Sequence, residues 1–231
     1  MDRPLRIAVL ASGRGSNLAA LLRACAADEL HARVIGVWSD RPSAPALDLA
    51  RVQNIPAQSL RPRDFIDREA FDRALFADID AALPDLIVCA GFMRILSAAV
   101  VAAHSQQMIN IHPSLLPRHP GLDTHSRAIA AGDSDHGASV HFMIPALDAG
   151  PVIAQTPIAI RADDNPQSLA ERLLPAEHEL LVATVALFTR HRLGHTDGRV
   201  LIDGQPLAAP LQMIDDQLQP ASPILASSDD R

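Results

Sequence analysis

An amide and an imidazole stand two residues apart near the middle of the chain, as Asn110 and His112. They lie in the apolar segment Met108–His112, which is typical of a strand, and side chains two apart on a strand point to the same face. Such a pair can hold a carbonyl oxygen and move a proton. The alternative is a structural pair whose hydrogen bonds are satisfied inside the protein.

A carboxylate, Asp148, lies after an apolar segment and just before Gly150 and Pro151. If folding brings it near His112, its negative charge would favour the charged imidazolium. Taken alone, an aspartate in this position is more typical of a turn in which the side chain bonds to the backbone. The chemical interpretation therefore depends on whether Asp148 and His112 meet.

A glycine-rich segment, Ser12–Asn17, follows the first predicted strand and precedes a predicted helix. Two glycines allow a tight turn, and the N–H groups at a helix N-terminus attract anions, so this loop predicts phosphate binding. A dinucleotide fingerprint would need a third glycine where Leu18 stands, although Asp40 occupies the place of a ribose-binding acid. A plain strand-to-helix turn with Ser as N-cap remains the alternative.

The composition excludes several kinds of chemistry. All 20 basic residues are arginine and tyrosine is absent, which excludes Schiff-base lysines, phosphate-gripping lysines and tyrosine acids. A net charge of −7 without a basic tract makes nucleic acid an unfavourable partner. No apolar segment approaches the length of a membrane span, so we expect a cytoplasmic protein that binds small molecules.

Cysteines and histidines do not form a metal-binding pattern. Cys25 and Cys89 are far apart, which predicts two buried thiols, with no disulfide and no zinc site. His141 alternates with apolar residues and is expected to be a buried histidine with satisfied hydrogen bonds. Three other histidines flank the candidate site loops and are expected to support them: His119, His125 and His136.

Short apolar segments alternate with amphipathic ones in the first half of the chain. This rhythm predicts an α/β fold, a Rossmann-like doubly wound, mostly parallel sheet with helices on both faces. The expected strands are Leu5–Ala11, Arg33–Ser39, Ile55–Leu60, Leu86–Ala90 and Met108–His112. The expected helices are Ser16–Ala26, Ser43–Gln53, Asp67–Leu83 and Ser97–His104.

The second half should extend the same sheet with partly antiparallel strands. After a loop at Ser114–Gly121, we expect a helix at Thr124–Ala131 and a long helix at Pro166–Arg192, interrupted by Pro175. From about residue 209 the sequence is polar and rich in proline, which predicts a frayed tail over residues 209–231. The expected strands are Gly137–Met143, Pro151–Ile160 and Arg199–Ile202.

Four segments together resemble the phosphoribosylglycinamide formyltransferases of the folate-dependent formyltransferase superfamily. They occur in the right order and spacing, and the resemblance runs from about residue 6 to about residue 206. It implies one formyltransferase domain over residues 1–208, with a nucleotide-phosphate half over about 1–105 and a folate and catalytic half over about 106–208. The segments are Ser12–Leu18, Ala90–Leu96, Asn110–Pro117 and Leu147–Ile153.

The resemblance also implies roles for individual residues. Asn110, His112 and Asp148 match the catalytic residues of the family. The positions that match ribonucleotide-binding residues are Gly13, Arg14, Gly15, Ser16, Asn17 and Glu177. Those that match folate-binding residues are Arg68, Met93, Arg94, Ile95, Leu96, Asn110, Ile144, Pro145, Ala146 and Leu147.

The implied reaction transfers the formyl group of 10-formyltetrahydrofolate, a co-substrate, to the amine of glycinamide ribonucleotide, without a metal. The substrate amine is the nucleophile, which agrees with a chain that has no lysine. Asn110 and His112 are expected to stabilise the oxyanion, with Asp148 supporting His112. The alternatives are a formyltetrahydrofolate hydrolase and a non-catalytic or NAD-type nucleotide-binding module. We expect a monomer or homodimer.

This chain departs from the usual family pattern at four places, and these affect details of the site more than the reaction. Asp123 stands where a histidine is common, and Ile144–Ala146 lacks the usual acidic residues. Ala149 replaces a common glycine, and Pro175 stands where a polar helical residue is usual.

Overall fold

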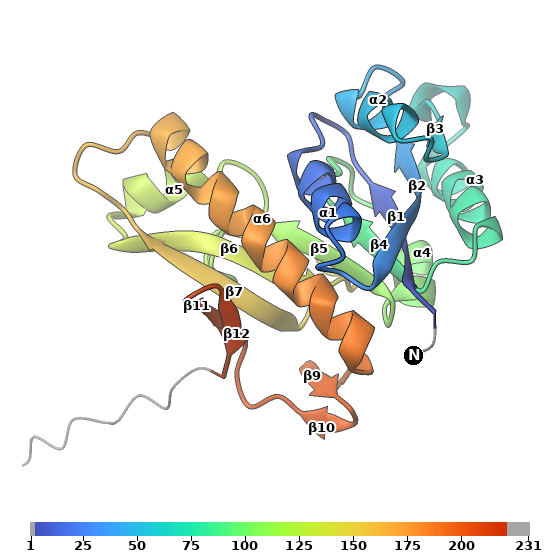
Figure 1. Ribbon diagram of the computed structural model, residues 1–231. Helices are drawn as coiled ribbons and strands as arrows, with labels where there is room; N and C mark the ends of the chain where they lie inside the picture. Colours follow the sequence, from blue (N-terminus) through green and yellow to red (C-terminus); the bar gives the residue numbers. More distant parts are fainter. Residues whose placement is uncertain (1–2, 221–231) are drawn as a thin grey trace, which may run out of the picture.

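The computed structural model describes residues 3–220. Its centre is a nine-stranded sheet in the order β12-β11-β7-β6-β5-β4-β1-β2-β3. A separate three-stranded sheet, β10-β9-β8, lies near the end of the chain (Figure 1). The α/β class and the mostly parallel sheet extended by antiparallel strands confirm the expected fold.

The first half of the chain forms five parallel strands joined by helices. The strands are β1 (Leu5–Leu10), β2 (Ala32–Ser39), β3 (Ala57–Ser59), β4 (Leu86–Cys89) and β5 (Met108–His112). The connecting helices are α1 (Ser16–Ala26), α2 (Pro45–Val52), the short 3₁₀ helix η1 (Pro62–Asp64), α3 (Arg68–Ala81) and α4 (Ala98–His104).

Strand order reverses between β1 and β4. The chain builds outward from β1 to β3 on one side and from β4 to β5 on the other. In open sheets of this kind, the loops that leave two such central strands diverge, and a crevice opens at their carboxyl ends. The glycine-rich loop follows β1 and the segment Gly91–Leu96 follows β4, so both lie at this crevice.

Beyond β5 the sheet becomes antiparallel and then mixed. The strand β6 (Asp135–Phe142) runs antiparallel to β5, and β7 (Val152–Ala159) runs antiparallel to β6. The helix α5 (Thr124–Ala131) precedes β6, and the long helix α6 (Pro166–Arg190) follows β7 and runs across this part of the sheet (Figure 1).

Two apolar cores hold helices to the two faces of the sheet. One core joins the sheet to α1, α2 and α6, and the other joins it to α3 and α4. Successive residues of a strand point to opposite faces. Ile7 and Val9 of β1 therefore enter the first core, while Ala8 and Leu10 enter the second. Burial on both faces explains why β4 is apolar throughout and why β1 is apolar except at Arg6 near its start.

The expected interruption at Pro175 was wrong, because α6 is continuous through it. Pro175 is exposed, so the carbonyl of Glu171, which loses its usual N–H partner, lies on the side of the helix that faces water. Leu173 and Leu180 on either side are fully buried. Their packing against the sheet keeps α6 a single continuous helix on both sides of Pro175.

The expected frayed tail was wrong for residues 211–219. They form β11 (Leu211–Ile214) and β12 (Gln217–Gln219), and β11 pairs with β7 as part of the large sheet. Leu211 is buried, and Met213 and Leu218 pack against the first core, which accounts for the order of this segment. The rest of the predicted tail, residues 221–231, lies outside the described residues.

Three further strands near the carboxyl end form the smaller sheet. These are β8 (Leu193–Thr196), β9 (Arg199–Ile202) and β10 (Gln205–Pro206). The sequence predicted β9 alone, because β8 and β10 are short, lack an apolar alternation, and form by pairing with β9.

Candidate active site

The strand β5 places Asn110 and His112 on one face, as the spacing predicted. His112 is buried and Asn110 is partly buried. Both side chains line the same hollow, of about 500 Å³, together with Asp148 from the loop between β6 and β7. The three side chains that the sequence singled out for acyl chemistry therefore meet at one place.

Asp148 faces His112, and its carboxylate is held by the backbone. Its Oδ2 lies 3.6 Å from Nδ1 of His112 and accepts a hydrogen bond of 2.8 Å from the N–H of Gly121. At 3.6 Å the contact with His112 is an ion-pair distance and is too long for a hydrogen bond. The side chains of His112 and Asp148 are only 7% and 11% exposed, so water screens the pair weakly.

The two ring nitrogens of His112 have different surroundings. Nε2 lies 3.0 Å from the carbonyl oxygen of His119, which can only accept, so Nε2 carries a proton and donates. Nδ1 faces Asp148. Because both nitrogens face acceptors, the charged imidazolium suits both contacts, and Nδ1 is the nitrogen available for proton exchange.

His141 holds the amide of Asn110 in position. The two residues are directly paired across β5 and β6, and Nδ2 of Asn110 lies 3.1 Å from Nε2 of His141. Nδ1 of His141 donates to the carbonyl of Phe142, so Nε2 accepts one hydrogen of the Asn110 amide. The second amide hydrogen is left for a ligand.

Burial lowers the pKa of His141, although the carboxylate of Asp148 and the hydrogen bond to Phe142 oppose this. A neutral His141 keeps Nε2 as an acceptor, which agrees with the hydrogen bond to Asn110. The sequence correctly indicated a buried histidine with satisfied hydrogen bonds, but it did not indicate that this histidine contacts Asn110. The antiparallel pairing of β5 with β6, which puts it opposite Asn110, is the signal that would have found it.

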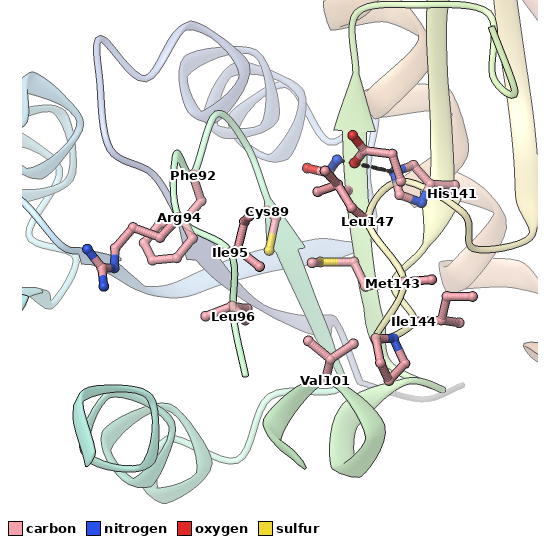
Figure 2. A pocket seen from close by; sticks show the side chains of 14 residues that line it. Cys89, Phe92, Arg94, Ile95, Leu96, Val101, His141, Met143, Ile144 and Leu147 are labelled. Atoms are coloured by element: carbon pink, nitrogen blue, oxygen red, sulfur yellow. Dashed lines mark hydrogen bonds and ion pairs between the residues drawn. The ribbon is translucent and has the colours of Figure 1, made fainter. Parts of the chain in front are cut away.

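Two loops form the walls of the hollow beside these residues. Figure 2 shows Phe92, Ile95 and Leu96 on one side and His141, Met143, Ile144 and Leu147 on the other. All the predicted folate-binding residues of these loops line the hollow or its extension: Met93, Arg94, Ile95, Leu96, Ile144, Pro145, Ala146 and Leu147. Mostly apolar walls with a few convergent polar groups are typical of a site for a small organic ligand.

Arg68 does not line this hollow. It is the first residue of α3 and is exposed. Arg94 lines the hollow, but its guanidinium lies 4.9 Å from the ring centre of Phe71 and points away from Met143 and Leu147 (Figure 2). The role of Arg68 toward a folate tail stays a prediction.

The glycine-rich loop turns tightly into α1. Gly15 has a φ of 77°, and an added Cβ there would lie 2.8 Å from the Cβ of Ala46, so this position requires glycine. No side chain within residues 3–220 caps the first turn of α1, which begins at Ser16. Its backbone N–H groups are therefore available to an anion. Gly13 and Arg14 are exposed beside them.

Glu177 of α6 lies next to Asn17 of this loop. Burial raises the pKa of Glu177 to about 7, and the neighbouring amide of Asn17 opposes the shift. The Oδ1 atom of Asn17 is buried and has no hydrogen-bond partner among residues 3–220. The structure thus brings all six predicted ribonucleotide-binding residues to one region, where α6 packs against the N-terminal end of α1.

The three flanking histidines lie around the loop that follows β5. His119 bonds to Asp133 through Nε2 at 2.7 Å, and the rings of His125 and His136 contact each other edge to face. Burial lowers the pKa of His136 to about 4. Asp123 is the N-cap of α5 and has a φ of 57°.

No group of three or more His, Cys, Asp or Glu residues within residues 3–220 is arranged to hold a metal ion. Among the helices of the same residues, none combines the length and the apolar character needed to cross a lipid bilayer.

Comparison with known proteins assigns the chain to a class. The sequence profile of the formyl transferase family matches residues 5–185, and the chain belongs to this family. This agrees with a site built from an amide, an imidazole and a carboxylate beside a ligand hollow.

Within the family, the chain groups with the phosphoribosylglycinamide formyltransferases. It is 41% identical over 203 residues to the enzyme of Escherichia coli, a match that covers 88% of this chain and 96% of that one. The enzyme of Mycobacterium tuberculosis is 40% identical over 188 residues, covering 81% and 86%. The resemblance inferred from the four sequence segments is confirmed.

Solved structures agree with this grouping. A phosphoribosylglycinamide formyltransferase from Coxiella burnetii superposes with a TM-score of 0.85 at 42% identity, covering 89% of this chain and 97% of that one. A formyltetrahydrofolate deformylase from Pseudomonas syringae superposes with a TM-score of 0.80 at 24% identity, and the match covers 87% of this chain and 66% of the deformylase. This likeness shows a shared fold alone.

Proposed function

We propose that this protein transfers the formyl group of 10-formyltetrahydrofolate to the amine of glycinamide ribonucleotide, a step of purine biosynthesis. The observation that carries the proposal is the meeting of Asn110, His112 and Asp148 at one hollow. Relatives that are 41% identical over 203 residues and 40% identical over 188 residues are named as phosphoribosylglycinamide formyltransferases, which supports the choice of substrate.

In the proposed reaction, the amine of the ribonucleotide attacks the formyl carbon and forms a tetrahedral intermediate. The free amide hydrogen of Asn110 and the Nδ1 proton of His112 donate to the oxyanion. One such donor contributes about 3 kcal/mol to transition-state stabilisation. Asp148 supplies the opposite charge that stabilises the imidazolium.

The proton balance needs no covalent enzyme intermediate. The attacking nitrogen loses a proton, and the folate nitrogen that leaves gains one. His112 and Asp148, which face each other at 3.6 Å, form the route between the two nitrogens. Binding both substrates in one crevice provides the rest of the acceleration, because it turns the encounter of two molecules into a step within one complex.

In the proposed complex, each substrate binds in its own part of the crevice. The N–H groups of α1 and the segment from Gly13 to Asn17 hold the phosphate, and Glu177 contacts the ribonucleotide. The apolar hollow between Gly91–Leu96 and Ile144–Leu147 takes the folate ring. We propose that the protein works in the cytoplasm, as a monomer or homodimer, and without a metal.

The proposal is tested by formyl transfer with the purified protein. 10-Formyltetrahydrofolate and glycinamide ribonucleotide are supplied together, with and without a metal chelator, and the change in ultraviolet absorbance is followed. We expect turnover that requires both substrates and is insensitive to the chelator. Equal turnover without the ribonucleotide would instead identify a hydrolase, and NAD(H) binding without turnover would identify a nucleotide-binding module.

A further inference from the structure

Ser12 connects the two loops that form the crevice. It is the first residue of the glycine-rich segment Ser12–Asn17, and its side chain is buried. Its Oγ accepts a hydrogen bond of 2.8 Å from the N–H of Met93, and its own N–H donates to the carbonyl of Gly91 at 3.0 Å. Ser12 therefore contacts the loop after β4 through both its backbone and its side chain.

Asp40 sets the direction of the Ser12 hydroxyl. Its Oδ1 lies 2.5 Å from Ser12 Oγ and accepts the single proton of that hydroxyl. The lone pairs of Ser12 Oγ are then left for the N–H of Met93. Asp40 is buried at the end of β2, in the place where a dinucleotide-binding protein would have its ribose-binding acid. Here that carboxylate is engaged inside the protein.

Few other contacts fix the position of the loop from Gly91 to Leu96, so the hydrogen bonds of Ser12 matter to it. Met93 and Ile95 are each 59% exposed, so their side chains add little packing to hold the loop. At its far end, the N–H of Ser97 donates to Oδ2 of the buried Asp72 at 2.6 Å. Ser12 and Asp72 thus hold the two ends of the segment that lines the folate hollow.

We propose that Ser12, oriented by Asp40, is a positioning residue that fixes the folate-lining loop Gly91–Leu96 against the ribonucleotide loop Gly13–Asn17. The inference rests on the proposed function of these two loops. The mechanism is geometric: without the hydroxyl, the N–H of Met93 loses its acceptor and the loop no longer has one preferred position. Folate binding then weakens, while the ribonucleotide groups on α1 and α6 are unchanged.

The test measures folate binding directly, by calorimetry with a stable 10-formyl folate analogue, next to steady-state kinetics. We expect Ser12→Ala to raise the Kd of the analogue and the KM of the folate substrate about tenfold, since it leaves the partly buried N–H of Met93 without its acceptor. The Kd of the ribonucleotide should stay within about twofold. Ser12→Thr keeps the hydroxyl and should restore folate binding to within about threefold of the wild type.

Asp40→Ala tests whether the two residues act through one hydroxyl. We expect a loss of folate affinity of about threefold, and no additional loss when Asp40→Ala is combined with Ser12→Ala, because residues in one hydrogen-bond network are not additive. Ser43→Ala, at an exposed serine close to Asp40, is the matched control and should leave folate affinity unchanged.

Several results would overturn the inference. The first is an unchanged folate Kd in Ser12→Ala, and the second is folate binding in Ser12→Thr that is as weak as in Ser12→Ala. The others are losses of folate affinity that add fully in the double variant of Ser12→Ala and Asp40→Ala, and a loss of folate affinity in Ser43→Ala equal to that in Ser12→Ala. If Ser12→Ala does not fold, Asp40→Ala carries the test, and unchanged folate binding in that variant contradicts the proposal. Absence of folate binding and formyl transfer in the wild type would instead refute the proposed function.

Discussion

At the scale of the residue, the site depends on which atom of each side chain is free. His112 uses Nε2 to bond to the backbone of His119, and Asn110 uses one amide hydrogen to bond to His141. Each residue therefore keeps one defined donor for the proposed reaction. Preorganised donors of this kind need no rearrangement when charge develops, which is why their removal affects kcat more than binding.

His112→Ala and Asp148→Asn should each lower kcat by about 100- to 1,000-fold, the usual effect of removing one oxyanion donor or its support. The Kd of the ribonucleotide should change little, because the glycine-rich loop is intact. Stopped-flow absorbance and calorimetry measure the two quantities. Asp163→Asn, the same chemical change at an exposed loop residue, is the control, and wild-type kcat in both site variants would refute the assignment.

Glu177 should make stability depend on pH. Its pKa in the folded protein is raised to about 7, so between pH 4.5 and 7 the folded state binds more protons than the unfolded state. The free energy of unfolding therefore falls as pH rises through this range. Between pH 5 and pH 8, the Tm of the wild type should fall more than that of Glu177→Gln, which stays neutral.

Glu179→Gln, at an exposed position on the same helix, is the matched control for Glu177→Gln and should follow the wild type. Parallel Tm curves for the wild type and Glu177→Gln would show that the carboxyl group of Glu177 titrates equally in both states.

At the scale of the element, segments with their own apolar pattern could be predicted from the sequence. The bounds of α1, β5 and α5 agree with the prediction, because each combines apolar periodicity with a clear beginning or end. The strands β8, β10, β11 and β12 could not be predicted. They are two to four residues long and are stable only when paired with partners that sequence patterns do not reveal.

Pro175→Ala should stabilise α6. Proline in a helix interior removes one backbone hydrogen bond and costs about 3 kcal/mol, part of which α6 already avoids by exposing this position to water. We expect the free energy of unfolding, measured with urea, to increase by about 1–2 kcal/mol. Pro166→Ala is the control, because proline is favoured at a helix start and its removal should bring no gain.

At the scale of the whole molecule, the sequence predicted which candidate site residues come together better than it predicted the residues that contact them. Asn110 and His112 share a strand, so their common face follows from the backbone alone. His141 reaches Asn110 through the pairing of β5 with β6, and Ser12 reaches Met93 across 81 positions of the chain. Such contacts depend on the order of strands in the sheet, which local patterns do not encode.

The carboxyl-terminal strands should contribute to global stability. Leu211 of β11 is 7% exposed and pairs with Ala154 of β7. Leu211→Ala should lower the free energy of unfolding by about 2 kcal/mol, at the low end for a buried leucine. Ile214→Ala removes an exposed side chain of the same strand and should cost less than about 1 kcal/mol. Equal effects of the two substitutions in urea unfolding would show that β11 does not add to the core.

The backbone at Asp148 limits how that position can be studied. Its φ of 47° lies in the left-handed region, which asparagine, aspartate and glycine adopt at little cost and other residues adopt with strain. If every amino acid were substituted at position 148, most variants would therefore combine backbone strain with the loss of the carboxylate, and their activities could not separate the two effects. Asparagine is the substitution that separates the two, since it removes the charge and keeps the turn.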